Sequence, residues 1–295
     1  MSIAIEVKNI SHNFKDKVVC DNISMDFEED KIYGLLGKNG AGKSTLINII
    51  TNQLICDSGE VKIFGKNPRE DVSVLEDVCV VREKEFFDAT YKVKDIFKAY
   101  SYFYKDYDYK LQDKLCRLFE INKKLVYKKL SRGMKTLVSN IIGICSNAPI
   151  TIFDEPTIGL DAVNRQEFYN VLLESYMDKN RTIIISTHLI NEVEELLEKV
   201  LMIKDGKVKV DDYIDEVRDK SHYISGKRED LNRLSILQEM ILAKSFGNNK
   251  MCAYYGDINN EDFIMIENSD IELDKMSLQD LFINMNKKEE ALYEK

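Results

Sequence analysis

The sequence predicts an α/β fold in which a largely parallel, helix-covered sheet is interrupted by a helical insert. Three observations predict it. Short apolar segments alternate with helical patterns from residue 150 onward, which is typical of parallel sheets. An apolar strand at residues 31–36 leads into a glycine-rich loop and then a helix. Residues 92–147 instead repeat apolar side chains at helical spacing, as Val93, Ile96 and Tyr100 do.

The N-terminal part of the chain, residues 3–36, is predicted to form strands, because Ile3, Ile5 and Val7 alternate with polar neighbours. The next elements are a helix at 44–50, a short strand at 60–64 and a buried strand at 78–81. Beyond the helical insert the predicted order is a strand at 150–153, a helix at 163–177, a strand at 182–186, a helix at 191–197, and a hairpin of 200–203 with 208–210 around Asp205-Gly206.

The signals weaken after about residue 220, where a small α+β unit is expected. It contains a predicted hairpin that turns at Gly247-Asn248-Asn249, and Ser277 is expected to cap a helix. We therefore expect one domain at residues 1–215, with its helical part at about 84–147, and an accessory region at 220–295.

Composition weighs against several classes of protein. The 295 residues include 51 acidic and 42 basic side chains, and a net charge of −9 disfavours broad nucleic-acid binding. Six scattered cysteines without a C-x-x-C pair, and only three histidines, disfavour a metal cluster. The apolar runs are too short to cross a bilayer, and the N-terminus lacks the features of a signal peptide. These features predict a soluble, cytoplasmic chain.

The glycine-rich loop fits the phosphate-binding pattern G-x-x-x-x-G-K-[ST]. Its glycines permit a sharp backbone path that points successive N–H groups at a polyphosphate. Lys43 is expected to reach the β- and γ-phosphates, and Ser44 to complete a Mg²⁺ shell. The strand before the loop and the helix after it favour this interpretation over a ligand-free turn. The residues predicted to bind are Gly37, Lys38, Asn39, Gly40, Ala41, Gly42, Lys43, Ser44 and Thr45.

A second motif places Asp154 and Glu155 at the end of the apolar strand that begins at Ile150. Two acids at a strand end are costly unless they leave the sheet edge to meet a cation. Asp154 is suited to hold Mg²⁺ through water, and Glu155 to polarise an attacking water as a general base. The alternative is an acid pair in a solvated turn, which the upstream phosphate loop makes less favourable.

Two weaker signals accompany these motifs. His188 follows the strand that ends in Ser186; a lone histidine is more often structural, but here it is able to face a γ-phosphate. In the segment Leu130 to Met134, Ser131 is a good N-cap for a helix over Lys135 to Cys145, and Gly133 leaves that helix end open to an anion. A capped helix start by itself is commonplace.

Taken in order, these motifs resemble those of the nucleotide-binding subunit of an ABC transporter over roughly residues 1–215. The loop at 37–45 resembles Walker A, Ile150 to Glu155 resembles Walker B, and Leu130 to Met134 resembles the signature LSGGQ. Asp161 falls at the D-loop and His188 at the switch histidine. Phe14 lies where the family has an aromatic residue that stacks on adenine.

The resemblance implies a P-loop NTPase core with a mostly parallel sheet, an antiparallel β subdomain, a helical insert and a small C-terminal α+β extension. It further implies a homo- or heterodimer of such subunits around two Mg-ATP molecules, with each ATP between one chain's phosphate loop and the other's signature. The dimer would drive a separate membrane permease from the inner face of the membrane. The implied site residues are Glu155, His188 and Lys43 for catalysis; Phe14, Ser131, Gly133 and Asp161 for the nucleotide, beside the phosphate loop; and Ser44, Asp154 and Glu83 for the metal.

The sequence departs from the family pattern at three positions. Arg132 and Met134 replace a glycine and a glutamine of the signature, and Glu83 stands where the family has the Q-loop glutamine. Such signatures resemble a bacterial subgroup of multidrug, antibiotic-peptide and bacitracin-type exporters. ATP is favoured over GTP because no N-K-x-D motif occurs. Two alternatives stay open: a soluble ABC ATPase that acts on nucleic acid or the ribosome, and a nucleotide-regulated binding module with little turnover.

Overall fold

The computed structural model describes residues 2–15, 17–82 and 90–287. The chain forms two compact units, Met1–Asp211 and Asp212–Lys295. The first unit has the mixed α/β architecture that the sequence predicts. None of the helices in the described residues combines the length and apolar character needed to span a bilayer.

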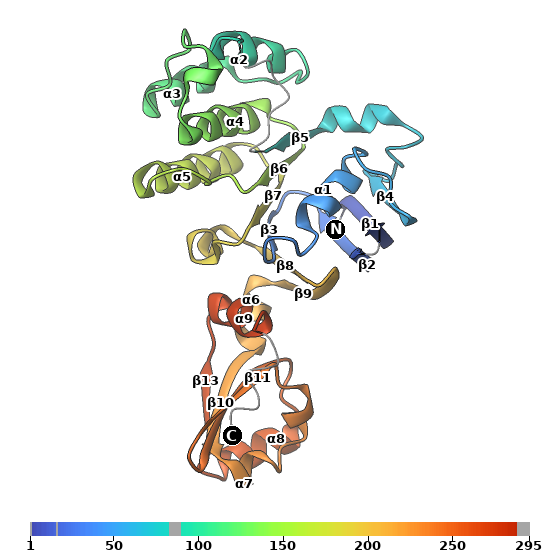
Figure 1. The fold of residues 1–295 in the computed structure, drawn as a ribbon, viewed down its shortest axis with the longest axis vertical. Coiled ribbons are helices and arrows are strands. Elements are labelled where there is room, and N and C mark those ends of the chain that lie inside the picture. The colour runs from blue at the N-terminus through green and yellow to red at the C-terminus, as the bar shows by residue number, and fades with distance from the viewer. Residues whose placement is uncertain (1, 16, 83–89, 288–295) are drawn as a thin grey trace. The chain divides into compact units, whose positions relative to one another are not determined.

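A six-stranded sheet forms the centre of the first unit (Figure 1). Its strand order is β5-β6-β7-β3-β8-β9, and the first five of these strands pair in parallel. Asp205 and Gly206 have φ angles of 50° and 75°, which suits the tight hairpin between β8 and β9 that the sequence predicts. The strands are β3 Ile32–Leu36, β5 Val78–Val81, β6 Ile150–Asp154, β7 Thr182–Thr187, β8 Lys199–Lys204 and β9 Lys207–Tyr213.

A smaller antiparallel sheet of order β2-β1-β4 belongs to the same unit. Its strands are β1 Ile3–Phe14, β2 Lys17–Glu28 and β4 Ser58–Ile63. Their apolar faces share one core with α1, Lys43–Ile50, in which Phe27 and Ile47 are fully buried. The short 3₁₀ helix η1, Val72–Asp77, leads from this region into β5. The antiparallel β part that the family resemblance implies is therefore present.

The helical insert packs on the long helix α4, Arg132–Ser146 (Figure 1). The insert contains α2 Val93–Ser101, α3 Tyr109–Leu118 and η2 Tyr127–Lys129, and α5 Ala162–Asp178 follows β6. Arg181 is 3% exposed, and its guanidinium donates to the carbonyls of Gly143 (3.4 Å) and Ile144 (3.2 Å) in the last turn of α4. This pairing supplies hydrogen bonds to carbonyls of the last helical turn, where the backbone hydrogen bonds of a helix run out.

The helix predicted at residues 191–197 is not one continuous helix and is not an α-helix. The segment forms two 3₁₀ turns, η3 Ile190–Glu192 and η4 Glu194–Leu196. Ile190 and Val193 are buried three residues apart, a spacing that fits a 3₁₀ helix as well as an α-helix. The backbone N–H of Val193 donates to the Ile190 carbonyl (3.0 Å), which closes the tighter turn.

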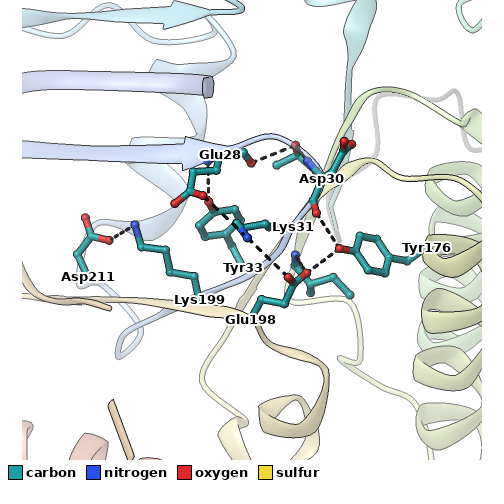
Figure 2. Close-up of polar contacts among 10 residues, drawn as sticks. Glu28, Asp30, Lys31, Tyr33, Tyr176, Glu198, Lys199 and Asp211 are labelled. Atoms are coloured by element: carbon teal, nitrogen blue, oxygen red, sulfur yellow. Dashed lines mark hydrogen bonds and ion pairs between the residues drawn. The ribbon is translucent and has the colours of Figure 1, made fainter. Parts of the chain in front are cut away.

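Polar side chains join the amino ends of the parallel strands (Figure 2). The Tyr33 hydroxyl accepts from the backbone N–H of Glu28 (2.6 Å). The Tyr176 hydroxyl lies 2.6 Å from a Glu198 carboxylate oxygen and 2.8 Å from the Asp30 carbonyl. The same Glu198 oxygen accepts from the backbone N–H of Ile32 (3.1 Å), where β3 begins. We call this group the amino-edge network; its members are Glu28, Asp30, Lys31, Tyr33, Tyr176 and Glu198.

The second unit is built on an antiparallel sheet of order β11-β12-β10-β13. Ile224, Cys252 and Ile266 belong to its separate apolar core. The predicted hairpin is present, and Ser277 caps α9 by accepting from the N–H of Asp280 (3.0 Å). The elements are α6 Ile214–Lys220, β10 Ser221–Lys227, α7 Arg228–Leu231, η5 Ser235–Glu239, β11 Leu242–Phe246, β12 Asn249–Tyr255, α8 Asn260–Glu267, β13 Glu272–Lys275 and α9 Leu278–Met285.

Candidate active site

Three adjacent parallel strands, β6, β7 and β3, end at the same edge of the sheet. The loops that leave this carboxyl edge carry the glycine-rich segment, the acid pair and His188. Ligands of parallel α/β sheets bind at this edge because the strand ends leave a crevice between diverging loops. The topology thus brings together three motifs that are more than 30 residues apart in the sequence.

The glycine-rich loop takes a backbone path that depends on its glycines. Gly40 and Gly42 have φ angles of 84° and 112°, a region that other residues rarely adopt. A Cβ on Gly37 would lie 2.7 Å from the Ile203 carbonyl oxygen, and one on Gly42 would lie 2.6 Å from that of Val19. Gly42 is also the N-cap of α1 and supplies no side-chain cap, so the first N–H groups of the helix keep their capacity to bind an anion.

Lys43 is held inside the curve of this loop. Its side chain is 5% exposed, and Nζ donates to the Gly37 carbonyl at 2.6 Å. Nζ also lies 3.6 Å from the Glu155 carboxylate. Burial lowers the pKa of Lys43, whereas the negative charges of Glu155 and Asp154 act in the opposite direction. The buried ammonium group is suited to a ligand that carries several negative charges, whereas the two carboxylates beside it favour a cation.

Asp154 ends β6 and joins hydroxyl groups from two other elements. Ser44, at the start of α1, donates to one carboxylate oxygen at 3.1 Å, and Ser186 of β7 donates to the other at 2.8 Å. Hydroxyl and carboxylate oxygens are the ligands that Mg²⁺ prefers in proteins. The donor set of Ser44 and Asp154 therefore fits a magnesium ion.

Glu155 adopts a left-handed backbone conformation, with φ at 54°. Such a conformation costs about 1–3 kcal/mol in a residue other than glycine and persists only where the surroundings enforce it. Its N–H donates to the Ser186 carbonyl (2.8 Å), and its carboxylate oxygens both lie 3.0 Å from His188 Nδ1. The carboxylate thus stands between the imidazole of His188 and the ammonium group of Lys43.

The other predicted nucleotide-binding residues lie elsewhere in the first unit. Ser131 is the N-cap of α4 and accepts from the N–H of Met134 (3.2 Å); Asp161 is the N-cap of α5 and accepts from that of Asn164 (2.9 Å). Phe14 ends β1 with its ring half exposed. The helix expected from Lys135 begins earlier, at Arg132. In the described part of the chain, no hydrogen bond or ion pair connects Ser131 or Asp161 to the Lys43–Glu155 pair.

Two polar residues at the carboxyl edge of the sheet were not identified from the sequence, and one predicted site residue is not described by the structure. Ser186 could have been found, because it lies near the end of β7, two residues before His188. Arg82 follows β5 at this edge, and burial lowers its pKa, while the charge of Asp154 acts in the opposite direction. The expected metal ligand Glu83 lies outside the described residues.

Comparison with known proteins agrees with this geometry. A family model described as ABC transporter matches residues 20–158. The chain is 34% identical to an uncharacterised ABC transporter ATP-binding protein of Methanocaldococcus jannaschii, a match that covers 76% of this chain and 83% of the relative. It is 30% identical to the lantibiotic transport ATP-binding protein SrtF of Streptococcus pyogenes, with 69% and 88% covered.

The same similarity appears among solved structures. A structure of the ATP-binding subunit of an ABC transporter matches with a TM-score of 0.65 at 22% identity. The match covers 73% of this chain and 92% of that subunit. At this level of identity the likeness concerns the fold.

Proposed function

The chain belongs to the ABC transporter family as an ATP-binding protein, an ATPase, and from this premise we propose that it dimerises around Mg-ATP and drives a separately encoded exporter of drugs or antimicrobial peptides. The observation that carries the proposal is the Lys43–Glu155–His188 cluster beside the Ser44–Asp154 pair at the carboxyl edge. It combines a polyphosphate-binding loop, a metal-binding oxygen pair and a candidate base.

Binding of ATP rests on the glycine-rich loop and on Lys43. The N–H groups at the start of α1 hold the phosphates, and the Lys43 ammonium group compensates the charge of the β- and γ-phosphates. Ser44 and Asp154 are the residues that would hold Mg²⁺, which neutralises charge on the phosphates when bound. Phe14 is the residue proposed to stack on adenine, because its ring is half exposed at the end of β1.

Hydrolysis then requires a base beside the γ-phosphate, and Glu155 is the group proposed for it. A water molecule attacks the γ-phosphorus in line, the bond between that phosphorus and the bridging oxygen of ADP breaks, and Glu155 accepts the proton that the water loses. His188 holds the Glu155 carboxylate in place at 3.0 Å, and Lys43 stabilises the charge on the transferring group. The products are ADP and phosphate.

The dimer and its membrane partner follow from the remaining motif residues. Ser131 is the N-cap of α4 and Gly133 lies in its first turn, a helix start suited to an anion, and Asp161 caps α5. We assign them to the ATP held by a partner subunit, either a second copy of the chain or a related one. The relative named for lantibiotic transport supports an antimicrobial peptide as the transported substrate. Docking on a permease would hold the dimer at the inner face of the membrane.

Phosphate release measures the proposed activity directly. The wild-type chain should release phosphate from Mg-ATP. Glu155→Gln should retain ATP binding but lose about 10²-fold or more of its turnover, the usual scale of general-base assistance. Wild-type binding of ATP without phosphate release would instead point to a nucleotide-regulated binding module. Isolation of a complex with nucleic acid or ribosomes, rather than with a membrane protein, would contradict the transport role.

A further inference from the structure

The loop that follows Glu155, residues 156–160, is held by the side chains of α4. Asn140 Nδ2 donates to the Pro156 carbonyl at 2.7 Å, and the Thr136 hydroxyl donates to the Ile158 carbonyl at 2.9 Å. The two donors are four residues apart and therefore lie on the same face of the helix. They are 1% and 7% exposed, so water does not replace these hydrogen bonds easily.

Two further contacts fix the same loop. A Cβ on Gly133, in the first turn of α4, would lie 2.4 Å from the Gly159 carbonyl oxygen, so the helix and the loop approach as closely as their backbones allow. From the other side, Arg165 of α5 donates to the Leu160 carbonyl at 3.2 Å. The carbonyls of residues 156, 158 and 160 thus each accept a hydrogen bond from a side chain outside the loop.

This arrangement bears on Glu155, which stands directly before the loop in a left-handed conformation. A backbone of this kind returns to an ordinary conformation unless its flanking residues are fixed. On one side, β6 and the Ser186 carbonyl fix it. On the other side, Glu155 is fixed by the 156–160 loop, which the side chains of α4 and α5 hold in place.

We propose that Thr136 and Asn140 are positioning residues for ATP hydrolysis, because they hold the loop that keeps the Glu155 carboxylate between His188 and Lys43. The inference rests on the proposed function of Glu155 and extends it. Neither side chain contacts the reacting atoms in this role; both act through the backbone on which Glu155 is mounted. Helix α4 therefore helps to position the general base of its own chain, and it also carries Ser131 at its N-terminus.

Single substitutions that remove one hydrogen-bond donor test the role. Thr136→Val removes the hydroxyl and keeps the shape, Thr136→Ser keeps the hydroxyl, and Asn140→Leu removes the amide. Ser146→Ala is a matched control, since Ser146 is a buried residue of α4 whose hydroxyl donates to the Gly143 carbonyl within the helix. Thermal melting of each variant establishes that it is folded. If Asn140→Leu does not fold, the comparison of Thr136→Val with Thr136→Ser is enough to test the role.

We expect the variants to change kcat and to leave the affinity for ATP nearly unchanged. Thr136→Val and Asn140→Leu should lower kcat about tenfold to a hundredfold, the scale of a misplaced catalytic group. Their Kd for Mg-ATP should stay within about twofold of the wild type, because Lys43 and its loop are untouched. Thr136→Ser should restore most of the turnover, and Ser146→Ala should keep it.

Combining Thr136→Val with Glu155→Gln shows whether Thr136 positions Glu155 or only stabilises the fold. In a Glu155→Gln background, Thr136→Val should lower the residual turnover no further, because the group it positions is already gone. An undiminished effect in that background would overturn the inference, as would wild-type kcat in both Thr136→Val and Asn140→Leu. Either result would still be compatible with the proposed function, provided that Glu155→Gln alone is inactive. Full turnover by Glu155→Gln would instead overturn the proposed function, and the inference with it.

Discussion

The two edges of the central sheet carry similar side chains for different purposes. At the amino edge, Glu198 accepts from the N–H of Ile32 where β3 begins, and the Tyr33 hydroxyl accepts from the N–H of Glu28 where β2 ends, so both groups bond to strand backbone. At the carboxyl edge, Lys43 begins α1 and Asp154 ends β6, and each stands next to a residue with unusual backbone, with φ at 112° for Gly42 and at 54° for Glu155.

The difference shows how to distinguish a functional polar cluster from a structural one. Polar groups that satisfy strand ends lower the free energy of the folded state and leave little capacity for a ligand. A buried ammonium group raises that free energy and is retained where a ligand needs it. Left-handed backbone alone does not mark the functional edge, since Asp30 of the amino-edge network has a φ of 57°. Residue type alone does not separate the two, since each edge contains Lys, Glu and hydroxyl groups.

The largest effect on ATP binding is expected at the carboxyl edge. Lys43→Ala should weaken Mg-ATP binding about tenfold to a hundredfold, the range of a hydrogen bond to a charged group. Calorimetric titration with Mg-ATP measures it. Lys31→Met, a lysine change at the other edge, is the control and should bind as the wild type does. Equal losses for both lysines would remove the distinction between the edges.

An intermediate effect is expected from Tyr33→Phe at the amino edge. Tyr33 is fully buried, and the loss of its hydroxyl leaves the N–H of Glu28 without this partner. The free energy of unfolding should fall by about 1–3 kcal/mol, while kcat should not change. Urea unfolding and phosphate release on the same preparation give both values. A loss of turnover without a loss of stability would assign this edge a functional part.

The smallest effect is expected for Lys31→Met. Its ammonium group lies 3.9 Å from a carboxylate oxygen of Glu28 and 3.9 Å from one of Glu198, at the outer limit of an ion pair. Partly exposed pairs of this length contribute less than about 1 kcal/mol, and less still at high salt. Unfolding in low and high salt should therefore show a difference between variant and wild type that is small and shrinks with salt. A large, salt-independent loss would mean that the amino-edge network depends on this charge.

The sequence predicted the carboxyl edge well because its signals are local. Gly37 to Ser44 and Asp154-Glu155 are contiguous motifs, and the α/β order alone brings them to one edge. The amino-edge network had no such signal, since Tyr176 and Asp30 are 146 residues apart. The donors of α4 were missed for the same reason: Asn140 looks like one polar residue in an apolar helix until the Pro156 carbonyl is placed beside it.

One paired measurement tests the central claim that the carboxyl edge catalyses and the amino edge stabilises. Glu155→Gln and Glu198→Gln make the same chemical change at opposite edges, and each variant is assayed for phosphate release and thermal melting. The account predicts that Glu155→Gln loses turnover without a fall in melting temperature. It predicts that Glu198→Gln keeps turnover and melts about 2 °C lower or more, as a loss near 1 kcal/mol implies for a unit of this size. Wild-type turnover in Glu155→Gln, or lost turnover in Glu198→Gln, would contradict the account.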